Sequence, residues 1–216
     1  MRKILVLALI VGLVASAMGM TAIAAKKKRK PKPVKTVLYL HGPTPVVGED
    51  DAADYLANGT IPSLTPAAPT EQVPKSRTYA VERGNDQCSG NPVFFPTWQG
   101  PLAGTMVGDA KLTVFTASPG GQLTARLWVD VDAGSLACNE TYIPPAKEVT
   151  VDVPAGQNQV TAVFKKLKLK AQGLVMIEIL TRQPQAHGSR VLYDATAQNS
   201  RFEFDCIPAK RSKKCA

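Results

Sequence analysis

Apolar and polar residues alternate with a period of two along most of the second half of the chain. Segment 148–153 (EVTVDV) places Val149, Val151 and Val153 on one face and acidic or hydroxyl side chains on the other, which is typical of a half-buried strand. The same alternation occurs over 111–117, 122–130, 159–165, 174–180, 190–193 and 201–206. Breaks containing Gly or Pro separate these segments, and no long helical pattern follows residue 25.

Short strands at this spacing predict an all-β protein, a two-sheet antiparallel β-sandwich of the jelly-roll type. We expect residues 78–208 to form this one domain. Residues 36–77 contain many prolines and little periodicity, so the pattern predicts a long irregular N-terminal arm with one short strand at 36–40 (TVLYL).

The first 25 residues have the order of a signal peptide. Arg2 and Lys3 precede an uncharged apolar stretch, and small residues follow up to Ala24 and Ala25. We therefore predict cleavage there and secretion to the extracellular space. The alternative is an uncut membrane anchor, because residues 4–25 carry no charge and are long enough to span a bilayer.

The positive net charge of +9 comes from two clusters. Basic residues dominate 26–35, which we interpret as a linker, and 209–216, which we interpret as a C-terminal tail, while the segment between them is slightly acidic. This distribution argues against a specific nucleic-acid groove. It favours salt-sensitive attraction to cell-wall polysaccharide or another anionic envelope polymer, the alternative being two solvated spacers.

All four cysteines follow the predicted cleavage point, and an even number in an exported chain predicts two disulfides. We favour pairing Cys88 with Cys138 and Cys206 with Cys215, the second of which would hold the basic tail against the last strand. A zinc site is the alternative, but the sequence has no Cys-x-x-Cys spacing.

Residues 104–132 (GTMVGDAKLTVFTASPGGQLTARLWVDVD) and 191–204 (VLYDATAQNSRFEF) resemble strands of a known module. It is the C-terminal jelly-roll domain of the Xaa-Pro dipeptidyl-peptidase and cocaine-esterase group, among the galactose-binding-like folds. Asn199 stands where that family usually has Pro before the pair matched by Ser200 and Arg201. The family's catalytic residues lie on a separate hydrolase domain, so the resemblance implies a stand-alone sandwich that binds glycans or serves as an accessory module.

The sequence contains no catalytic motif. No Gly-x-Ser-x-Gly nucleophile turn is present, and both histidines, His41 and His187, precede glycine in segments expected to be loops. We therefore do not expect an enzyme.

Segment 122–130 carries the best candidate for ligand binding. Trp128, Arg126 and Thr124 share its polar face, and an exposed indole beside hydrogen-bonding groups suits a sugar ring. Trp98 is a second candidate. The alternatives are that the arm or a loop covers Trp128 and that Trp98 packs into one end of the sandwich.

Asp130 and Asp132 could hold a structural calcium ion at the end of this strand, and the sequence indicates no other cofactor. The leading interpretation is a secreted, non-catalytic β-sandwich that binds carbohydrate or another envelope polymer. The alternative is a structural or protein-interaction module that assists another exported protein. Oligomeric state has no signature in the sequence.

Overall fold

The computed structural model describes residues 31–42, 62–78, 80–81, 97–117, 120–131, 143–181, 190–210 and 212–216. The chain divides into residues 1–30 and residues 31–216, and everything below concerns the second unit. Every regular element in its described residues is a strand, which confirms the predicted all-β class. These residues contain no helix long and apolar enough to cross a membrane.

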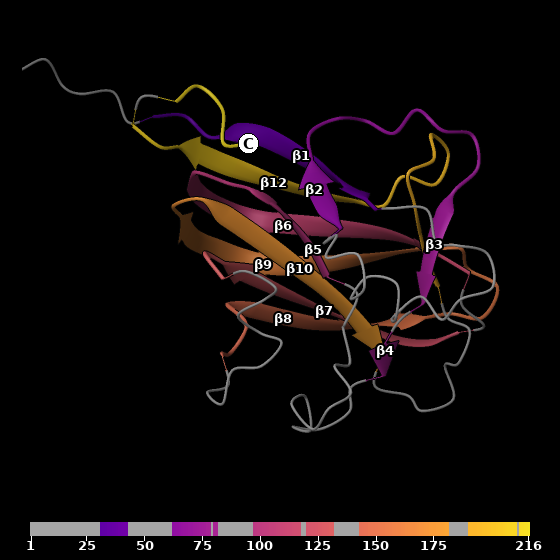
Figure 1. Ribbon diagram of the computed structural model, residues 1–216. Coiled ribbons are helices and arrows are strands. Elements are labelled where there is room, and N and C mark those ends of the chain that lie inside the picture. The colour runs from indigo at the N-terminus through magenta and orange to yellow at the C-terminus, as the bar shows by residue number, and fades with distance from the viewer. Residues whose placement is uncertain are drawn as a thin grey trace, which may run out of the picture. The chain divides into compact units, whose positions relative to one another are not determined.

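The strands are β1 (Val34–His41), β2 (Ser63–Thr65), β3 (Lys75–Thr78), β4 (Ala80–Val81), β5 (Thr97–Pro101), β6 (Gly104–Thr116), β7 (Gly121–Val129), β8 (Lys147–Val153), β9 (Gln159–Ala171), β10 (Leu174–Thr181), β11 (Arg190–Tyr193) and β12 (Arg201–Pro208). Hydrogen bonds join them in the order β3-β11-β6-β12-β1-β2-β5-β10-β7-β8, with β9 beside β6 and β4 beside β10 (Figure 1).

The strands form one curled, hydrogen-bonded sheet, where the sequence pattern predicts two. The narrowest join lies between β2 and β5, which share a single parallel pair, Ser63 with Gln99. On one side of the join lie β1, β12, β6 and β9, and on the other lie β5, β10, β7 and β8. Side chains from both groups, such as Phe202 and Ile177, enter the same core, as expected for a sandwich.

The sheet begins earlier than the predicted domain start at residue 78. β1 lies between β12 and β2, with Val34 opposite Cys206 and Tyr39 opposite Arg201. β3 pairs with β11. Residues 34–41 and 75–78 are therefore part of the sheet and not of an arm; residues 43–61 lie outside the described part of the chain. The pattern could not show this, because the partners of these short strands are far away in sequence.

A β-bulge explains why β6 and β9 are longer than the sequence pattern predicts. Their register shifts between Gly108 and Ala110, and both Gly108 (φ 77°) and Lys166 (φ 54°) have a positive φ. The Lys166 N–H donates to Asp109 Oδ1 at 2.9 Å. On β9 the bulge shifts the inward-facing positions by one residue, from Phe164 to Leu167, which breaks the alternation there, whereas on β6 it leaves exposed residues at 108 and 109 that interrupt the pattern.

Ser200, directly before β12, joins three strands from a fully buried position. Its hydroxyl accepts a hydrogen bond from the Phe115 N–H (2.8 Å) and donates one to the Leu192 carbonyl (2.6 Å). Its own carbonyl accepts from the Leu40 N–H at 3.0 Å. The motif that carries the family resemblance thus has a structural role here, since it satisfies backbone groups where β1, β6 and β11 diverge.

Candidate functional site

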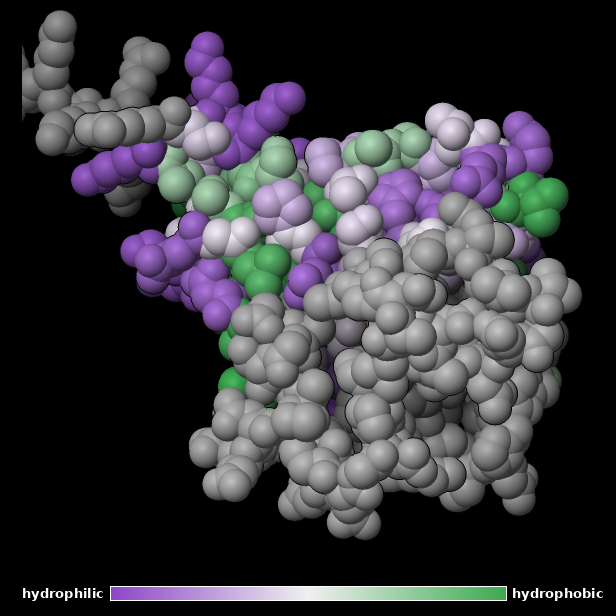
Figure 2. Space-filling model, viewed as in Figure 1, coloured by the Kyte–Doolittle hydropathy of each residue, from purple (hydrophilic) through white to green (hydrophobic). Residues whose placement is uncertain are grey.

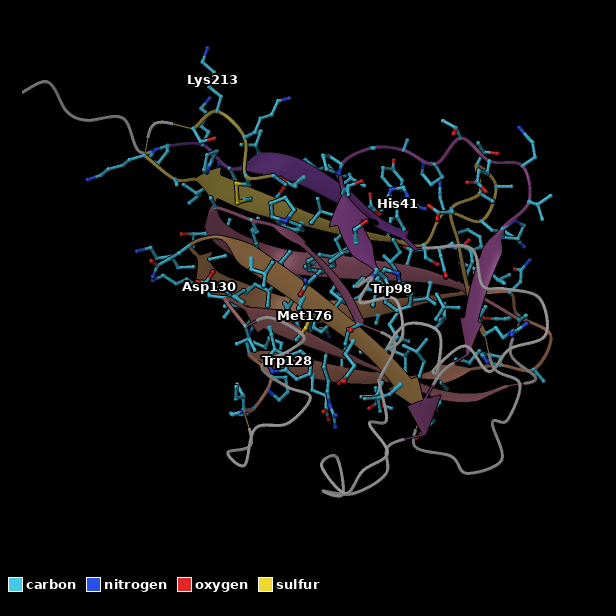
Figure 3. All side chains as sticks on the ribbon, in the orientation of Figure 1. His41, Trp98, Trp128, Asp130, Met176 and Lys213 are labelled. Carbon is cyan, nitrogen blue, oxygen red and sulfur yellow. A yellow bond between two sulfur atoms is a disulfide. The ribbon has the colours of Figure 1, made fainter. Side chains whose placement is uncertain are left out.

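The predicted ligand patch on β7 is buried. Thr124, Arg126 and Trp128 do share one face of the strand, opposite core residues such as Leu127. The Trp128 side chain is only 4% exposed, however, and its indole N–H donates to the Ile143 carbonyl at 3.3 Å. Trp128 lies beside Met176 of β10 and is not an exposed platform for a sugar ring (Figure 3). This burial matches the alternative that a neighbouring segment covers Trp128.

Arg126 belongs to a buried group of three charges. Its Nε donates to Glu148 Oε2 of β8 at 2.6 Å, and its Nη1 lies 3.4 Å from Glu178 Oε2 of β10. Glu178 is 2% exposed. The hydroxyls of Thr124 and Thr150 meet at 2.9 Å in the next row. The polar face of β7 therefore links three strands, and the Arg126 charge is neutralised by its own chain.

The sequence-based ligand patch on β7 did not include Glu148 or Glu178, although the sequence contains one indication of a role for Glu178. Glu178 is the only charged residue in the apolar segment 174–180, and a charge there predicts a buried partner. Nothing in the sequence indicates that Arg126 is that partner, because the pairing of β7 with β10 joins distant segments.

Trp98 lies on the core side of the sheet. Its side chain is fully buried on β5 and packs edge-to-face on Tyr193, with ring centroids 5.8 Å apart. It shares no surface patch with Trp128, and its burial matches the alternative of a packing role.

Asp130 braces the turn between β9 and β10. Its Oδ1 accepts hydrogen bonds from the backbone N–H groups of Gln172 (2.8 Å), Gly173 (3.0 Å) and Leu174 (3.3 Å). The Asp130 carboxylate therefore already accepts hydrogen bonds from the backbone. The residue itself has a positive φ of 55°. Asp132 lies outside the described residues, within which no group of three or more metal-ligating side chains occurs. The calcium site stays a prediction.

His41, at the end of β1, links distant backbone segments. Its Nδ1 contacts the Asp194 carboxylate, and its Nε2 donates to the Ala67 carbonyl at 2.9 Å. The same carboxylate accepts from the Gly42 N–H at 3.1 Å. Since a carbonyl already occupies Nε2, this His–Asp pair holds the chain together and does not present a free base. His187 lies outside the described residues.

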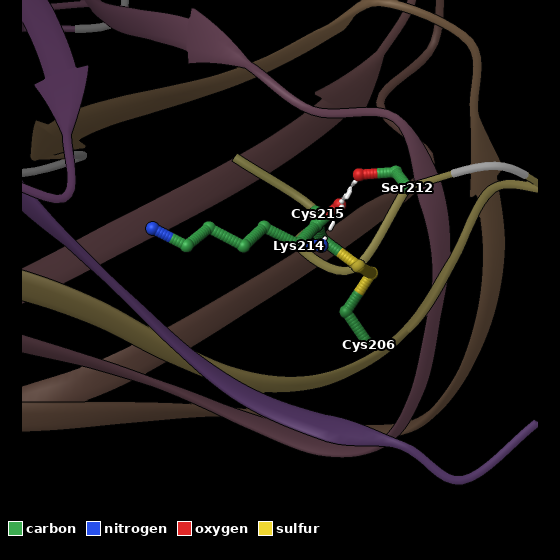
Figure 4. Close-up of a disulfide and its surroundings, with 4 residues drawn as sticks. All are labelled: Cys206, Ser212, Lys214 and Cys215. Carbon is green, nitrogen blue, oxygen red and sulfur yellow. Dashed lines mark hydrogen bonds between the residues drawn. A yellow bond between two sulfur atoms is a disulfide. The ribbon is translucent and has the colours of Figure 1, made fainter.

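The predicted disulfide between Cys206 and Cys215 is confirmed. Cys88 and Cys138 lie outside the described residues. Beyond β12 the chain turns back, so that the Ala103 N–H donates to the Cys215 carbonyl (2.8 Å) and the Ala209 N–H donates to the Ala103 carbonyl (3.3 Å). Ser212 and Lys214 are hydrogen-bonded to each other at the tip (Figure 4). The predicted basic tail is therefore folded onto the start of β6.

This disulfide lies at one end of four adjacent strands. A single row of paired residues crosses β1, β12, β6 and β9: Val34 pairs with Cys206, Cys206 with Met106, and Met106 with Leu169. The start of β1, the end of β12, the start of β6 and the end of β9 consequently meet at the same edge of the sheet as the C-terminal turn.

The three segments that meet there carry exposed lysines, and we call this surface the basic end; Figure 2 shows hydrophilic side chains around the C-terminal turn and the start of β1. Its lysines are Lys32, Lys35, Lys168, Lys170, Lys210, Lys213 and Lys214. Lys213 projects away from the sheet (Figure 3). Sequence reasoning identified the two basic clusters but not their convergence, nor the part played by β9, because both depend on strand pairing between distant segments.

The basic end retains a positive excess. Glu203 lies 3.6 Å from Lys35 Nζ, but it also lies 3.5 Å from Arg201 Nε, and Lys35 itself is 72% exposed. Asp205 is exposed on β12. Among the described side chains, Glu203 and Asp205 do not balance the seven lysines of this end, so the surface attracts multivalent anions, and salt weakens that attraction because the charges are exposed.

No protein-family model and no curated protein matches this chain. Several solved structures align with most of it, among them the following three. A CocE/NonD family hydrolase from Staphylococcus aureus has 10% identity and a TM-score of 0.46, and the match covers 82% of this chain and 37% of that one. An aminopeptidase from the marine sediment archaeon Thaumarchaeota archaeon has 10% identity and a TM-score of 0.48, covering 81% and 37%. An α-amino acid ester hydrolase has 12% identity and a TM-score of 0.46, covering 82% and 36%.

The chain thus spans little more than a third of the length of each solved structure. The S. aureus protein carries the family description to which the sequence resemblance points.

Proposed function

We propose that this protein is an exported, non-catalytic β-sandwich that binds an anionic polymer of the cell envelope, such as an acidic polysaccharide, through its basic end. The observation that supports this function is the convergence of the basic segments at one end of the sheet. The polar face of β7, the other candidate, is buried and internally neutralised.

A polymer suits this surface better than a single small anion. Alternate residues of a strand lie about 7 Å apart on one face, so Lys168 and Lys170 of β9 present two charges in a row. The C-terminal turn and β1 add further lysines beside them. A chain of repeated anionic groups contacts several of these lysines at once, and linked contacts raise affinity far above that of each one.

A membrane surface suits the basic end less well. Positive charge alone gives reversible, salt-sensitive binding to anionic lipid, and firmer peripheral binding also uses apolar side chains that enter the membrane. Among the described residues, the large exposed apolar side chains are Val34 and Val73, and only Val34 belongs to this end.

Export is supported by the oxidised cysteines. A disulfide forms and persists in oxidising compartments, which agrees with the signal peptide that the sequence predicts.

The test is retention of the purified, oxidised protein on dextran sulfate, with neutral dextran as the blank, over a series of salt concentrations. We expect retention on the sulfated polymer that decreases with salt, and roughly fivefold weaker binding or more for Lys170→Glu, since one lysine near an anionic surface contributes about 1 kcal/mol. Lys147→Glu, an equal charge change at an exposed site on β8, is the control. Equal losses in both variants, or no retention at low salt, would contradict the proposal.

Recovery of the protein from its host tests the alternative function, an accessory module that binds another protein. If it is recovered from the host with a stoichiometric protein partner that high salt does not remove, and does not bind the sulfated polymer, the protein-interaction function is the better one.

A further inference from the structure

We propose that the Cys206–Cys215 disulfide controls the basic end by holding the C-terminal lysines beside those of β9, so that the oxidised chain binds a polyanion more tightly than the same chain without the bond. This inference rests on the proposed function and adds its dependence on oxidation. It starts from what keeps the C-terminal turn in place.

Within the described residues of the turn, the disulfide is the covalent tie to the sheet, and hydrogen bonds and packing add to it. The hydrogen bonds that tie it to the sheet both involve Ala103, through the Cys215 carbonyl and the Ala209 N–H. The bonds between Ser212 and Lys214 lie within the turn and do not attach it to a strand (Figure 4). Cys215 is 4% exposed and is the residue of the turn that enters the core. Without the bond, the described part of the turn keeps the hydrogen bonds to Ala103 and the packing of residues 215 and 216 against the core, but it loses its covalent tie to β12.

The start of β6 is shaped to receive the bond. A Cβ atom at Gly104 would lie 2.6 Å from the Ile207 carbonyl oxygen, 2.8 Å from Cys206 Sγ and 2.9 Å from Cys215 Sγ. No side chain fits at residue 104, so the sulfur atoms of Cys206 and Cys215 pack directly against the Gly104 backbone. Gly104 also pairs with Ala171, the last residue of β9, which places the disulfide next to the strand that carries Lys168 and Lys170.

The position of the lysines matters because several of them contact the same polymer at once. Lysines fixed on one surface contact a polymer without loss of chain entropy, whereas lysines on a loose end must be ordered at each contact. Opening the disulfide removes no positive charge. It is therefore expected to weaken the binding that Lys213 and Lys214 share with β9 and to leave the salt-dependent attraction of the other lysines.

The chemistry of the switch is ordinary disulfide exchange. A dithiol reductant breaks the S–S bond and supplies two electrons and two protons, which gives two thiols on the protein and converts the reductant to its cyclic disulfide. Reoxidation outside the cell reverses the step.

The experiment measures the dissociation constant for dextran sulfate in four variants: the oxidised wild type, Lys213→Ser/Lys214→Ser, Cys206→Ser/Cys215→Ser, and the four substitutions combined. In the oxidised background we expect the lysine substitutions to weaken binding roughly thirtyfold, the order expected from two lysines near an anionic surface. The cysteine substitutions should cause a similar loss, and adding the lysine substitutions to them should change binding less than about twofold. Lys147→Ser/Arg190→Ser, two exposed basic residues on β8 and β11 away from the basic end, is the matched control.

Several outcomes would overturn the inference. One is an unchanged dissociation constant in Lys213→Ser/Lys214→Ser, and another is an equal effect of the lysine substitutions with and without the disulfide. Tighter binding to vesicles of anionic phospholipid than to dextran sulfate would indicate a membrane and would also overturn it.

If circular dichroism shows that the cysteine variant is unfolded, a short glycine insertion between Ser212 and Lys213 replaces it, because this change keeps the bond and the charge but frees the lysines. Wild-type affinity in that variant would overturn the inference. If the oxidised wild type does not bind the polymer at all, the proposed function itself fails, which is a different result from binding that ignores the disulfide.

Discussion

Arg126 shows how a residue that looks like part of a ligand site can be required by the fold. Its guanidinium contacts Glu148, which is partly exposed, and Glu178, which is almost completely buried. A buried charge that loses its partner costs far more than the pair contributes when it is intact. The main role of Arg126 is therefore to compensate Glu178.

We expect Arg126→Met to lower the free energy of unfolding by about 3–5 kcal/mol, because the buried Glu178 would lose its ion pair with Arg126. Adding Glu178→Gln should restore a large part of the loss, since the buried group is then neutral. Urea denaturation of the single and double variants measures both effects. A single variant within about 1 kcal/mol of wild type would show that Glu178 has other compensation.

At the level of strands, the sequence predicts the features that depend only on residues close together in the chain. The alternation over 148–153 places β8 within one residue of its observed start, and the alternation over 122–130 predicts correctly which side chains of β7 share a face. Both follow from the period of two, which needs no knowledge of neighbours. The disulfide between Cys206 and Cys215 was predictable for a similar reason, since nine positions separate the two residues.

Features that depend on distant strands were not predictable in this way. The pairing of β1 with β12 makes 34–41 part of the sheet, although its sequence differs little from that of an isolated extended segment. The bulge at Gly108 conceals the continuity of β6. The burial of Trp128 depends on what lies over the strand, and a single strand's pattern contains no information about that.

Gly104 provides a test at the level of the strand. We expect Gly104→Ala to destabilise the protein by about 1–3 kcal/mol, because the added methyl group would overlap the Ile207 carbonyl and the Cys206 sulfur. It should also increase the fraction of free thiols during refolding. Thermal melting and thiol titration measure these effects.

Gly173→Ala is the matched control, since a Cβ atom there meets nothing within 4 Å. We expect a change of less than about 0.5 kcal/mol. Equal effects of the two substitutions would mean that the space above Gly104 can adjust.

For the whole molecule, the position of β1 determines where the folding unit begins. β1 fills the place between β12 and β2, and β2 connects the two groups of strands. A protein shortened to begin at residue 78 would lose both and would expose the inner edge of β12. We expect no cooperative thermal transition from such a protein, whereas one that begins at Pro31 should melt as the full chain does. A cooperative transition in the shorter protein would show that β5 to β12 can form a core alone.

The pairing of the first strand with the last one also affects how the protein is made. During synthesis β1 emerges long before β12, so the partner on one of its edges is absent until translation is nearly complete. Partial chains therefore cannot complete the sheet around β1 until β12 has been made, so the last strand to be synthesised decides when the first one is fixed.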